Sequence, residues 1–150
     1  MKIKTTRFGV LEVSEAALIT LPSGLIGLKD VTRFAVVERD QAGWFQWWQA
    51  VDQASTAFIT LDPRRIVPDY DLSGAEEDLK AVEAEAASKR MIATLVSLPE
   101  NRLDAMTVNL LAPIVVNRRT REGRQIVLPN ERYPVAYRMV SSLQPLPVAA

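Results

Sequence analysis

The carboxylates that could do acid–base chemistry are concentrated in one stretch, where Asp62, Asp69 and Asp71 flank two prolines and Tyr70. A pair of carboxylates can act as general acid and base, as in glycoside hydrolysis. Asp-Pro and Pro-Asp are also common turn sequences, and we interpret the stretch as turn structure. The chain contains no histidine and no cysteine, which removes the commonest general base and any thiolate nucleophile or metal ligand. With no phosphate loop or nucleophile elbow in the sequence, we expect neither an enzyme nor a cofactor.

A dense aromatic cluster lies within residues 44–51, where we expect a strand. Strand alternation divides its members between two faces: Trp44, Gln46 and Trp48 on one, and Phe45, Trp47 and Gln49 on the other. One set could fill the core while the other covers a neighbouring loop. Alternatively, one set could form an exposed docking patch, because tryptophan often anchors binding hot spots.

The charges balance, with 18 basic and 18 acidic residues, but they are unevenly placed. Residues 63–89 contain seven acidic and four basic side chains, and residues 90–150 contain eight arginines and four acids. A uniformly basic nucleic-acid-binding protein would not show this division. Four of the arginines crowd the predicted hairpin loop Arg118–Arg124, which is either a solvated tip or, with the aromatic residues, a site for single-stranded nucleic acid.

One amphipathic helix is predicted at about Ser73–Lys89. Ser73 and Glu76 have the spacing of a capping box, and an apolar stripe follows at alternating spacings of three and four. We expect the helix to pack through Leu79 and Val82. Its other side is acidic, and such a surface is either simply solvated or able to steer a basic protein partner; the acidic residues are Glu76, Glu77 and Glu83, with Asp69 and Asp71 upstream.

Short strand signals dominate the rest of the chain. We therefore predict a mainly β fold, a small antiparallel β-barrel-like single domain over residues 1–140, followed by a disordered tail at 141–150. The N-terminus lacks the apolar core of a signal peptide, and the chain contains no run of membrane-spanning length, which favours the cytoplasm. The predicted strands are Lys2–Thr6, Val10–Val13, Leu18–Leu21, Arg33–Glu38, Trp44–Val51, Thr56–Leu61, Met91–Leu98, Ile114–Asn117, Gln125–Leu128 and Tyr133–Val140.

The segment Thr107–Asn117 reads as strand but contains Pro113, with Asn109 and Asn117 on either side of an apolar run. Proline has no N–H to donate to a sheet and is rare in central strands. The segment is therefore either two strands that meet at a bend or bulge, or an edge strand with one side unpaired.

Several segments, in order and spacing, resemble the FliW family of flagellar assembly factors. The stretch Ile19–Leu28 is similar to the family pattern I-T-F-P-x-G-L-x-G-F, and Phe45–Val51 is similar to F-x-W-L-Q-S-V. The clearest match is Asn109–Asn117 followed by Gln125–Leu128.

The resemblance implies a cytoplasmic, non-enzymatic regulator that is monomeric when free and acts neither on membranes nor directly on nucleic acid. Its implied partners are flagellin and CsrA, a small basic RNA-binding protein that represses flagellin translation; free FliW would bind CsrA and relieve the repression. We expect CsrA at the acidic helix surface and flagellin near the aromatic cluster and the proline bend. The partner-binding candidates are Phe45, Trp47, Gln49, Asp69, Tyr70, Glu76, Glu77, Glu83, Asn109 and Pro113.

Overall fold

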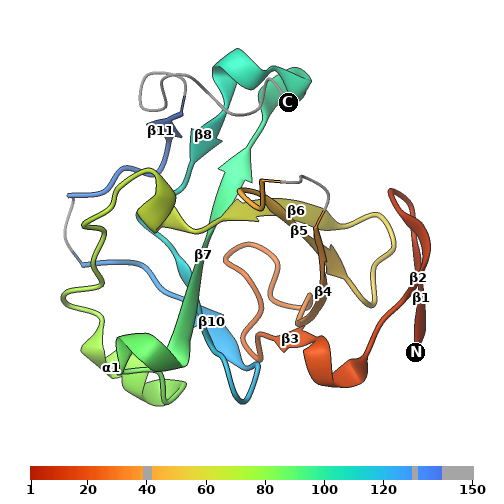
Figure 1. The fold of residues 1–150 in the computed structure, drawn as a ribbon, viewed down its shortest axis with the longest axis horizontal. Helices are drawn as coiled ribbons and strands as arrows, with labels where there is room; N and C mark the ends of the chain where they lie inside the picture. Colours follow the sequence, from red (N-terminus) through yellow and green to blue (C-terminus); the bar gives the residue numbers. More distant parts are fainter. Residues whose placement is uncertain (39–41, 130–131, 140–150) are drawn as a thin grey trace.

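One strongly curved antiparallel sheet dominates the computed structural model, which describes residues 1–38, 42–129 and 132–139 (Figure 1). Along the sheet the strands follow the order β10-β9-β7-β6-β5-β4-β3, and β8 and β11 branch from β7. The sheet strands are β3 (Ile19–Thr20), β4 (Arg33–Glu38), β5 (Gln46–Ala50), β6 (Ala57–Leu61), β7 (Arg90–Ser97), β8 (Thr107–Val108), β9 (Ile114–Asn117), β10 (Gly123–Gln125) and β11 (Tyr137–Arg138).

The two ends of this sheet meet at one isolated parallel bridge between Thr20 and Glu122. There, the Thr20 N–H donates to the Arg121 carbonyl at 2.9 Å. A single bridge does not close the sheet with a continuous ladder, so the fold is barrel-like rather than a sealed barrel. The predicted mainly β, antiparallel, barrel-like fold is thus confirmed.

Two apolar cores form on the two sides of the curved sheet. The inner core gathers inward side chains of β3, β4, β5, β7 and β9, with Phe34 and Trp48 as its largest members. The outer core lies between β7, β9 and the segment around α1 (Glu76–Ala81), and it includes Leu79, Val108 and Val115. Because alternate residues of β9 enter different cores, Ile114, Val115 and Val116 are all fully buried.

A separate hairpin packs beside the sheet, at the opposite side from α1 (Figure 1). It consists of β1 (Lys2–Thr5) and β2 (Gly9–Glu12), paired from Lys2–Glu12 to Thr5–Gly9. Gly9 has φ +70°, a conformation that costs glycine little, and the hairpin predicted at this glycine is confirmed. Ile3 fixes the hairpin to the sheet by packing with Leu18 and Ala35.

The helix is confirmed but is much shorter than predicted, since α1 spans only Glu76–Ala81. The capping box is wrong, because the N-cap residue is Ala75 and no side chain caps the helix. Asp71 Oδ1 instead accepts from the Ser73 N–H at 2.9 Å, and Gly74 follows at φ +92°. Leu79 and Val82 are buried as expected.

The helix ends early because the next segment is held by the sheet. Glu83 has φ +54°, outside the right-handed helical region. Its carbonyl accepts from Asn117 Nδ2 at 2.8 Å, and the Val82 carbonyl accepts from the same nitrogen at 3.1 Å. A short 3-10 turn at Ala87–Lys89 then leads into β7, so the rest of the predicted helix does not form.

The proline segment consists of two strands that meet at a bend, and the alternative of an edge strand is wrong. β7 pairs with both β8 and β9, through Val96–Val108 and Ala93–Ile114. Five residues, 109–113, therefore lie opposite only two on β7. β8 and β9 are also paired on their other sides, with β11 and β10.

The remaining strand predictions overlap the observed strands, most with shifted ends. In the predicted strand Tyr133–Val140, Tyr137–Arg138 form β11, and Val140 lies outside the described residues. β4 has the predicted bounds, whereas β5 begins at Gln46 rather than at residue 44. β10 is assigned at Gly123–Gln125, although the Ile126 and Leu128 N–H groups still donate to the carbonyls of Pro113 and Leu111. The predicted tail, 141–150, lies outside the described residues. Among the described helices, none is long and apolar enough to cross a membrane.

Candidate functional site

The aromatic cluster on β5 divides between interior and surface. Trp48 is fully buried beside Phe34, with ring centroids 5.8 Å apart. Trp47 points to the opposite face and is half-buried, with the ring of Phe8 at 5.7 Å and the guanidinium of Arg7 at 4.4 Å. Within the strand, the predicted alternation is therefore correct.

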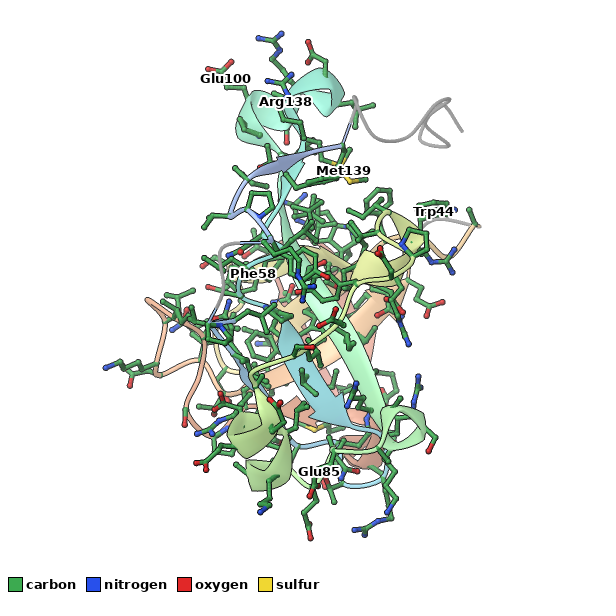
Figure 2. The ribbon with its side chains drawn as sticks, turned by 90° about the vertical axis from the view of Figure 1, so that its left-hand side faces the viewer. Trp44, Phe58, Glu85, Glu100, Arg138 and Met139 are labelled. Atoms are coloured by element: carbon green, nitrogen blue, oxygen red, sulfur yellow. The ribbon has the colours of Figure 1, made fainter. Side chains whose placement is uncertain are left out.

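The alternation does not extend to Trp44 and Phe45, because both residues precede the strand. Both side chains pack against the outer core, so their predicted placement on opposite faces is wrong. The guanidinium of Arg65 lies 5.1 Å from the Trp44 ring. Figure 2 shows Trp44 at the outer margin of the molecule, away from Phe58.

Gln49, a candidate for flagellin contact, is fully buried and ties a turn together. Its Nε2 donates to the carbonyls of Ala50 at 3.0 Å and Thr56 at 3.1 Å, and it also contacts two carbonyls of the intervening turn. A side chain used in this way offers nothing to a partner in this conformation.

Three other candidates stabilise the proline bend. Asn109 Oδ1 accepts from the N–H groups of Leu111 and Ala112, both at 3.1 Å. Tyr70 is buried, and its hydroxyl donates to the Leu110 carbonyl at 2.6 Å. Pro113 is buried, and its carbonyl accepts from the backbone of β10's extension. These contacts give Asn109, Tyr70 and Pro113 a structural role.

The remaining candidates form a region that we call the acidic surface: Asp69, Glu76, Glu77 and Glu83. All four side chains are exposed, and none forms an ion pair with a basic group of the described residues. Two neighbouring carboxylates are neutralised: Asp71 pairs with Arg132, and Asp78 pairs with Arg124, each at 2.9 Å. Lys80 is the basic side chain of α1, so the region around the helix carries an excess of negative charge.

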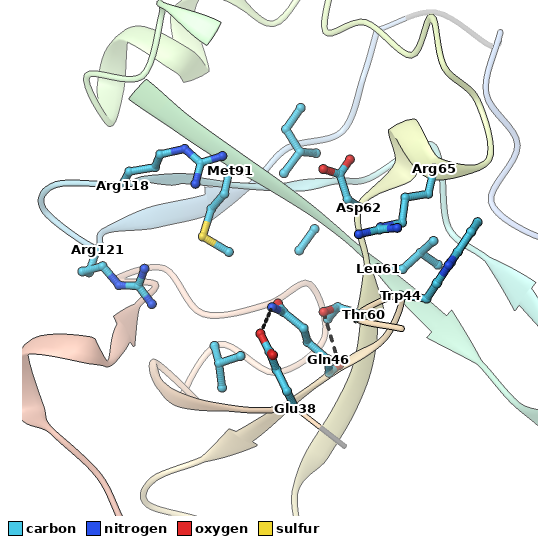
Figure 3. A pocket seen from close by; sticks show the side chains of 14 residues that line it. Glu38, Trp44, Gln46, Thr60, Leu61, Asp62, Arg65, Met91, Arg118 and Arg121 are labelled. Atoms are coloured by element: carbon cyan, nitrogen blue, oxygen red, sulfur yellow. Dashed lines mark hydrogen bonds between the residues drawn. The ribbon is translucent and has the colours of Figure 1, made fainter. Parts of the chain in front are cut away.

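A second charged region, absent from the predicted site, is a pocket of about 430 Å³. We call it the arginine pocket, because Arg65, Arg118 and Arg121 line it together with Trp44 (Figure 3). The sequence placed Arg118 and Arg121 in one loop. The sequence hypothesis that combined this loop with the aromatic residues agrees with the position of Trp44, but nothing in the sequence indicated that the 3-10 turn at Pro63–Arg65 would share the pocket.

The two carboxylates of the arginine pocket are already engaged. Asp62 pairs with Arg64, with Nη2 2.6 Å from Oδ2 and Nε 3.0 Å from Oδ1. Burial raises the pKa of Asp62, but the hydrogen bonds from Arg64 and the charges of Arg64 and Arg65 outweigh burial and hold it below its ordinary value. Glu38 accepts from Gln46 Nε2 at 2.9 Å. The pocket therefore has a positive character.

The described residues contain no group of three or more acidic, histidine or cysteine side chains that could hold a metal ion. Asp62, Asp69 and Asp71, the carboxylates considered for acid–base chemistry, occupy different environments. Asp62 and Asp71 are ion-paired, and Asp69 is exposed. The turn interpretation is consistent with 3-10 or turn backbone after Asp62 and at Pro68–Asp69.

Comparison with known proteins gives one consistent result. The family model described as FliW protein matches residues 2–139. The flagellar assembly factor FliW of Natranaerobius thermophilus is 38% identical over 128 residues, covering 85% of each chain. Its counterpart from Syntrophus aciditrophicus is 34% identical over 137 residues, covering 91% of this chain and 86% of the other.

The fold agrees with that result. A crystal structure of the flagellar assembly factor FliW superposes with a TM-score of 0.81 at 24% identity, covering 92% of this chain and 96% of the other. That likeness shows the fold, and the sequence matches show the family. The chain belongs to the FliW family.

Proposed function

We propose that this protein is a non-enzymatic, cytoplasmic regulator of flagellar assembly that binds flagellin and a CsrA-type translational repressor in alternation. Bound to the repressor, it would relieve repression of flagellin translation; accumulating flagellin would capture it and restore repression. Family membership supports this proposal, since the curated relatives carry the name flagellar assembly factor. Such a switch needs two binding surfaces whose occupancies are linked, and no catalytic centre.

The observation that carries the proposal is the acidic surface. Its four exposed carboxylates have no ion-pair partner among the described residues, although the chain as a whole carries no net charge. Clustered charge of one sign speeds association with a partner of the opposite sign. A small basic repressor is a partner of that kind.

For flagellin, Trp47 and Phe45 remain the proposed contacts. Trp47 keeps part of its ring exposed beside Phe8 and Arg7, and large amphipathic side chains of this type anchor protein interfaces. The proposed surface does not include Gln49, Tyr70 and Pro113, which are buried, or Asn109, whose Oδ1 accepts from backbone N–H groups of the proline bend.

Charge reversal tests the repressor surface. The triple variant Glu76→Lys, Glu77→Lys and Glu83→Lys should bind CsrA more slowly and more weakly, with the largest difference at low salt. The matched control reverses three exposed carboxylates elsewhere, at Glu12, Glu15 and Asp30. Isothermal titration calorimetry in low salt should show lost affinity in the first variant alone. Unchanged CsrA binding by that variant would refute the assignment.

A displacement experiment tests the switch itself. Flagellin added to a preformed complex with CsrA should release the repressor, as measured by size-exclusion chromatography of the mixture. The variant Trp47→Ala should retain CsrA in the presence of flagellin, because its contact with flagellin is weakened. A ternary complex that is stable at every flagellin concentration would contradict alternation.

One observation favours a second function, binding of single-stranded nucleic acid. Arg118 and Arg121 line the same pocket as Trp44, which brings cations and an aromatic ring together as that function requires. Arg124, however, is paired with Asp78, and Trp48 is fully buried. A gel-shift titration with single-stranded RNA decides between the two, since salt-sensitive micromolar binding without CsrA would support the second function.

A further inference from the structure

The arginine pocket combines guanidinium groups with a few aliphatic contacts. Residues of β4, β6 and β7 line it, and among them Val36 on β4 and Met91 on β7 are the aliphatic side chains that are half-buried rather than buried. Figure 3 shows Arg118 and Arg121 on one side of the space and Arg65 with Trp44 on the other. Its volume of about 430 Å³ is within the range of small-ligand and side-chain pockets.

The three arginines keep unused hydrogen-bonding capacity. Among the described residues, no carboxylate lies within ion-pair distance of Arg65, Arg118 or Arg121. Arg121 donates from Nη2 to the Ala17 carbonyl at 3.0 Å, which positions the side chain, while its buried Nε has no partner among those residues. Arg65 is held against Trp44. Two of the three guanidiniums are thus oriented by the protein.

We propose that the arginine pocket binds an extended segment of a partner protein in which a carboxylate side chain lies next to an aliphatic one. A guanidinium presents paired donors that match a carboxylate, so the acidic group would contact the arginines. The aliphatic group would contact the half-buried side chains of Val36 and Met91. This inference is independent of which proteins the chain regulates.

The lining favours a peptide over nucleic acid. Single-stranded nucleic acid is bound by several rings on which successive bases stack. Trp44 is the aromatic side chain that lines the pocket, and Arg65 lies over it. Trp47 contacts Phe8 on the other face of β5, and Trp48 is buried in the inner core. Aliphatic contacts and paired donors remain, and those fit an acidic, apolar segment.

The test uses the full chain and a fluorescein-labelled hexapeptide of alternating leucine and glutamate. A matched hexapeptide of alternating leucine and glutamine controls for charge. Fluorescence anisotropy should show saturable binding of the acidic peptide alone. Arg118→Ala should weaken that binding about tenfold, the size expected for one charge-assisted contact. Arg119→Ala is the matched control, because Arg119 is exposed and adjacent but does not line this pocket.

Four results would overturn the proposal. The first is the absence of saturable binding up to peptide concentrations on the order of 1 mM. The second is equal binding of the glutamine peptide, and the third is an equal loss of binding in Arg118→Ala and Arg119→Ala, which would indicate non-specific attraction. The fourth is displacement of the peptide by single-stranded RNA at lower concentration than by unlabelled peptide, which would assign the pocket to nucleic acid.

Discussion

The Asn109–Asn117 segment and the two charged surfaces use polar groups in opposite ways. In the segment, the side chains of Asn109 and Asn117 form six hydrogen bonds with backbone groups of the protein itself. The four carboxylates of the acidic surface and the three arginines of the arginine pocket have no ion-pair partner among the described residues. The difference separates residues that specify this fold from residues available to another molecule.

The largest effect should come from Asn117, whose side chain is buried. Its Oδ1 accepts from the N–H groups of Arg119 and Thr120, and its Nδ2 donates to the carbonyls of Val82 and Glu83. Asn117→Ala removes these four bonds and should lower the free energy of unfolding by about 3 kcal/mol. Urea denaturation measures the loss. If Asn117→Ala lowered the free energy of unfolding no more than the exposed control Arg119→Ala does, the hydrogen bonds of Asn117 would not be what stabilises this fold.

A smaller loss is expected for Trp47, which belongs to both categories. Replacing a fully buried tryptophan with alanine lowers the free energy of unfolding by about 3–5 kcal/mol. Because Trp47 is half-buried, Trp47→Ala should lower it by about 2 kcal/mol. Thermal denaturation measures this loss, and calorimetry with flagellin measures binding. A loss typical of a core residue together with unchanged flagellin binding would make Trp47 purely structural.

Much of the fold could be predicted because its signals are local. Gly9 indicates the turn of the β1–β2 hairpin, and Pro113 indicates a break in the strand that contains it. The pairing of β7 with both β8 and β9 shows that this break is a bend. Tertiary contacts decide the remaining features. The helical pattern after Ser73 is regular, yet Gly74 lies at positive φ and Asn117 holds the carbonyl of Glu83, so six residues form α1.

The candidate site could be predicted only where the exposure of a side chain follows from the periodicity of its own helix or strand. The acidic side of α1 is exposed as its periodicity indicated. Gln49 and Tyr70 occupy predicted surface positions but bond to carbonyls inside the protein, which no single-residue pattern reveals. The arginine pocket is built from residues between positions 36 and 121, and neither their spacing nor their composition indicates that they meet.

Tyr70 gives a third, smaller effect and a dependence on pH. Tyr70→Phe removes the hydroxyl that donates to the buried Leu110 carbonyl and should cost about 1.5 kcal/mol at neutral pH. Burial, followed by electrostatic interaction with Tyr133 and Asp71, raises the pKa of Tyr70 above its ordinary value of 10.0. The unfolded chain therefore loses this proton first.

The resulting stabilisation is complete below pH 10 and is lost as the pH rises toward the folded-state pKa. Wild type and Tyr70→Phe should consequently converge in stability in alkaline solution, as measured by urea denaturation at a series of pH values. A difference that grows above pH 10 would contradict the buried, neutral hydroxyl.

The smallest effects should separate two arginines of the same hairpin. Arg124 pairs with Asp78 across a partly exposed contact of 2.9 Å, so Arg124→Ala should cost about 0.5 kcal/mol of folding free energy. Arg118 is exposed, and its side chain has no hydrogen-bond or ion-pair partner among the described residues, so Arg118→Ala should leave stability unchanged. A double-mutant cycle with Asp78→Ala isolates the contribution of the Arg124–Asp78 pair to stability.

The effects of the same two substitutions on acidic-peptide binding should have the opposite order. Arg118→Ala should weaken binding more than Arg124→Ala, because Arg118 lines the pocket and Arg124 does not. If either substitution lowered both folding stability and peptide affinity to the same extent, this hairpin would not divide its arginines between a structural and a partner-binding role.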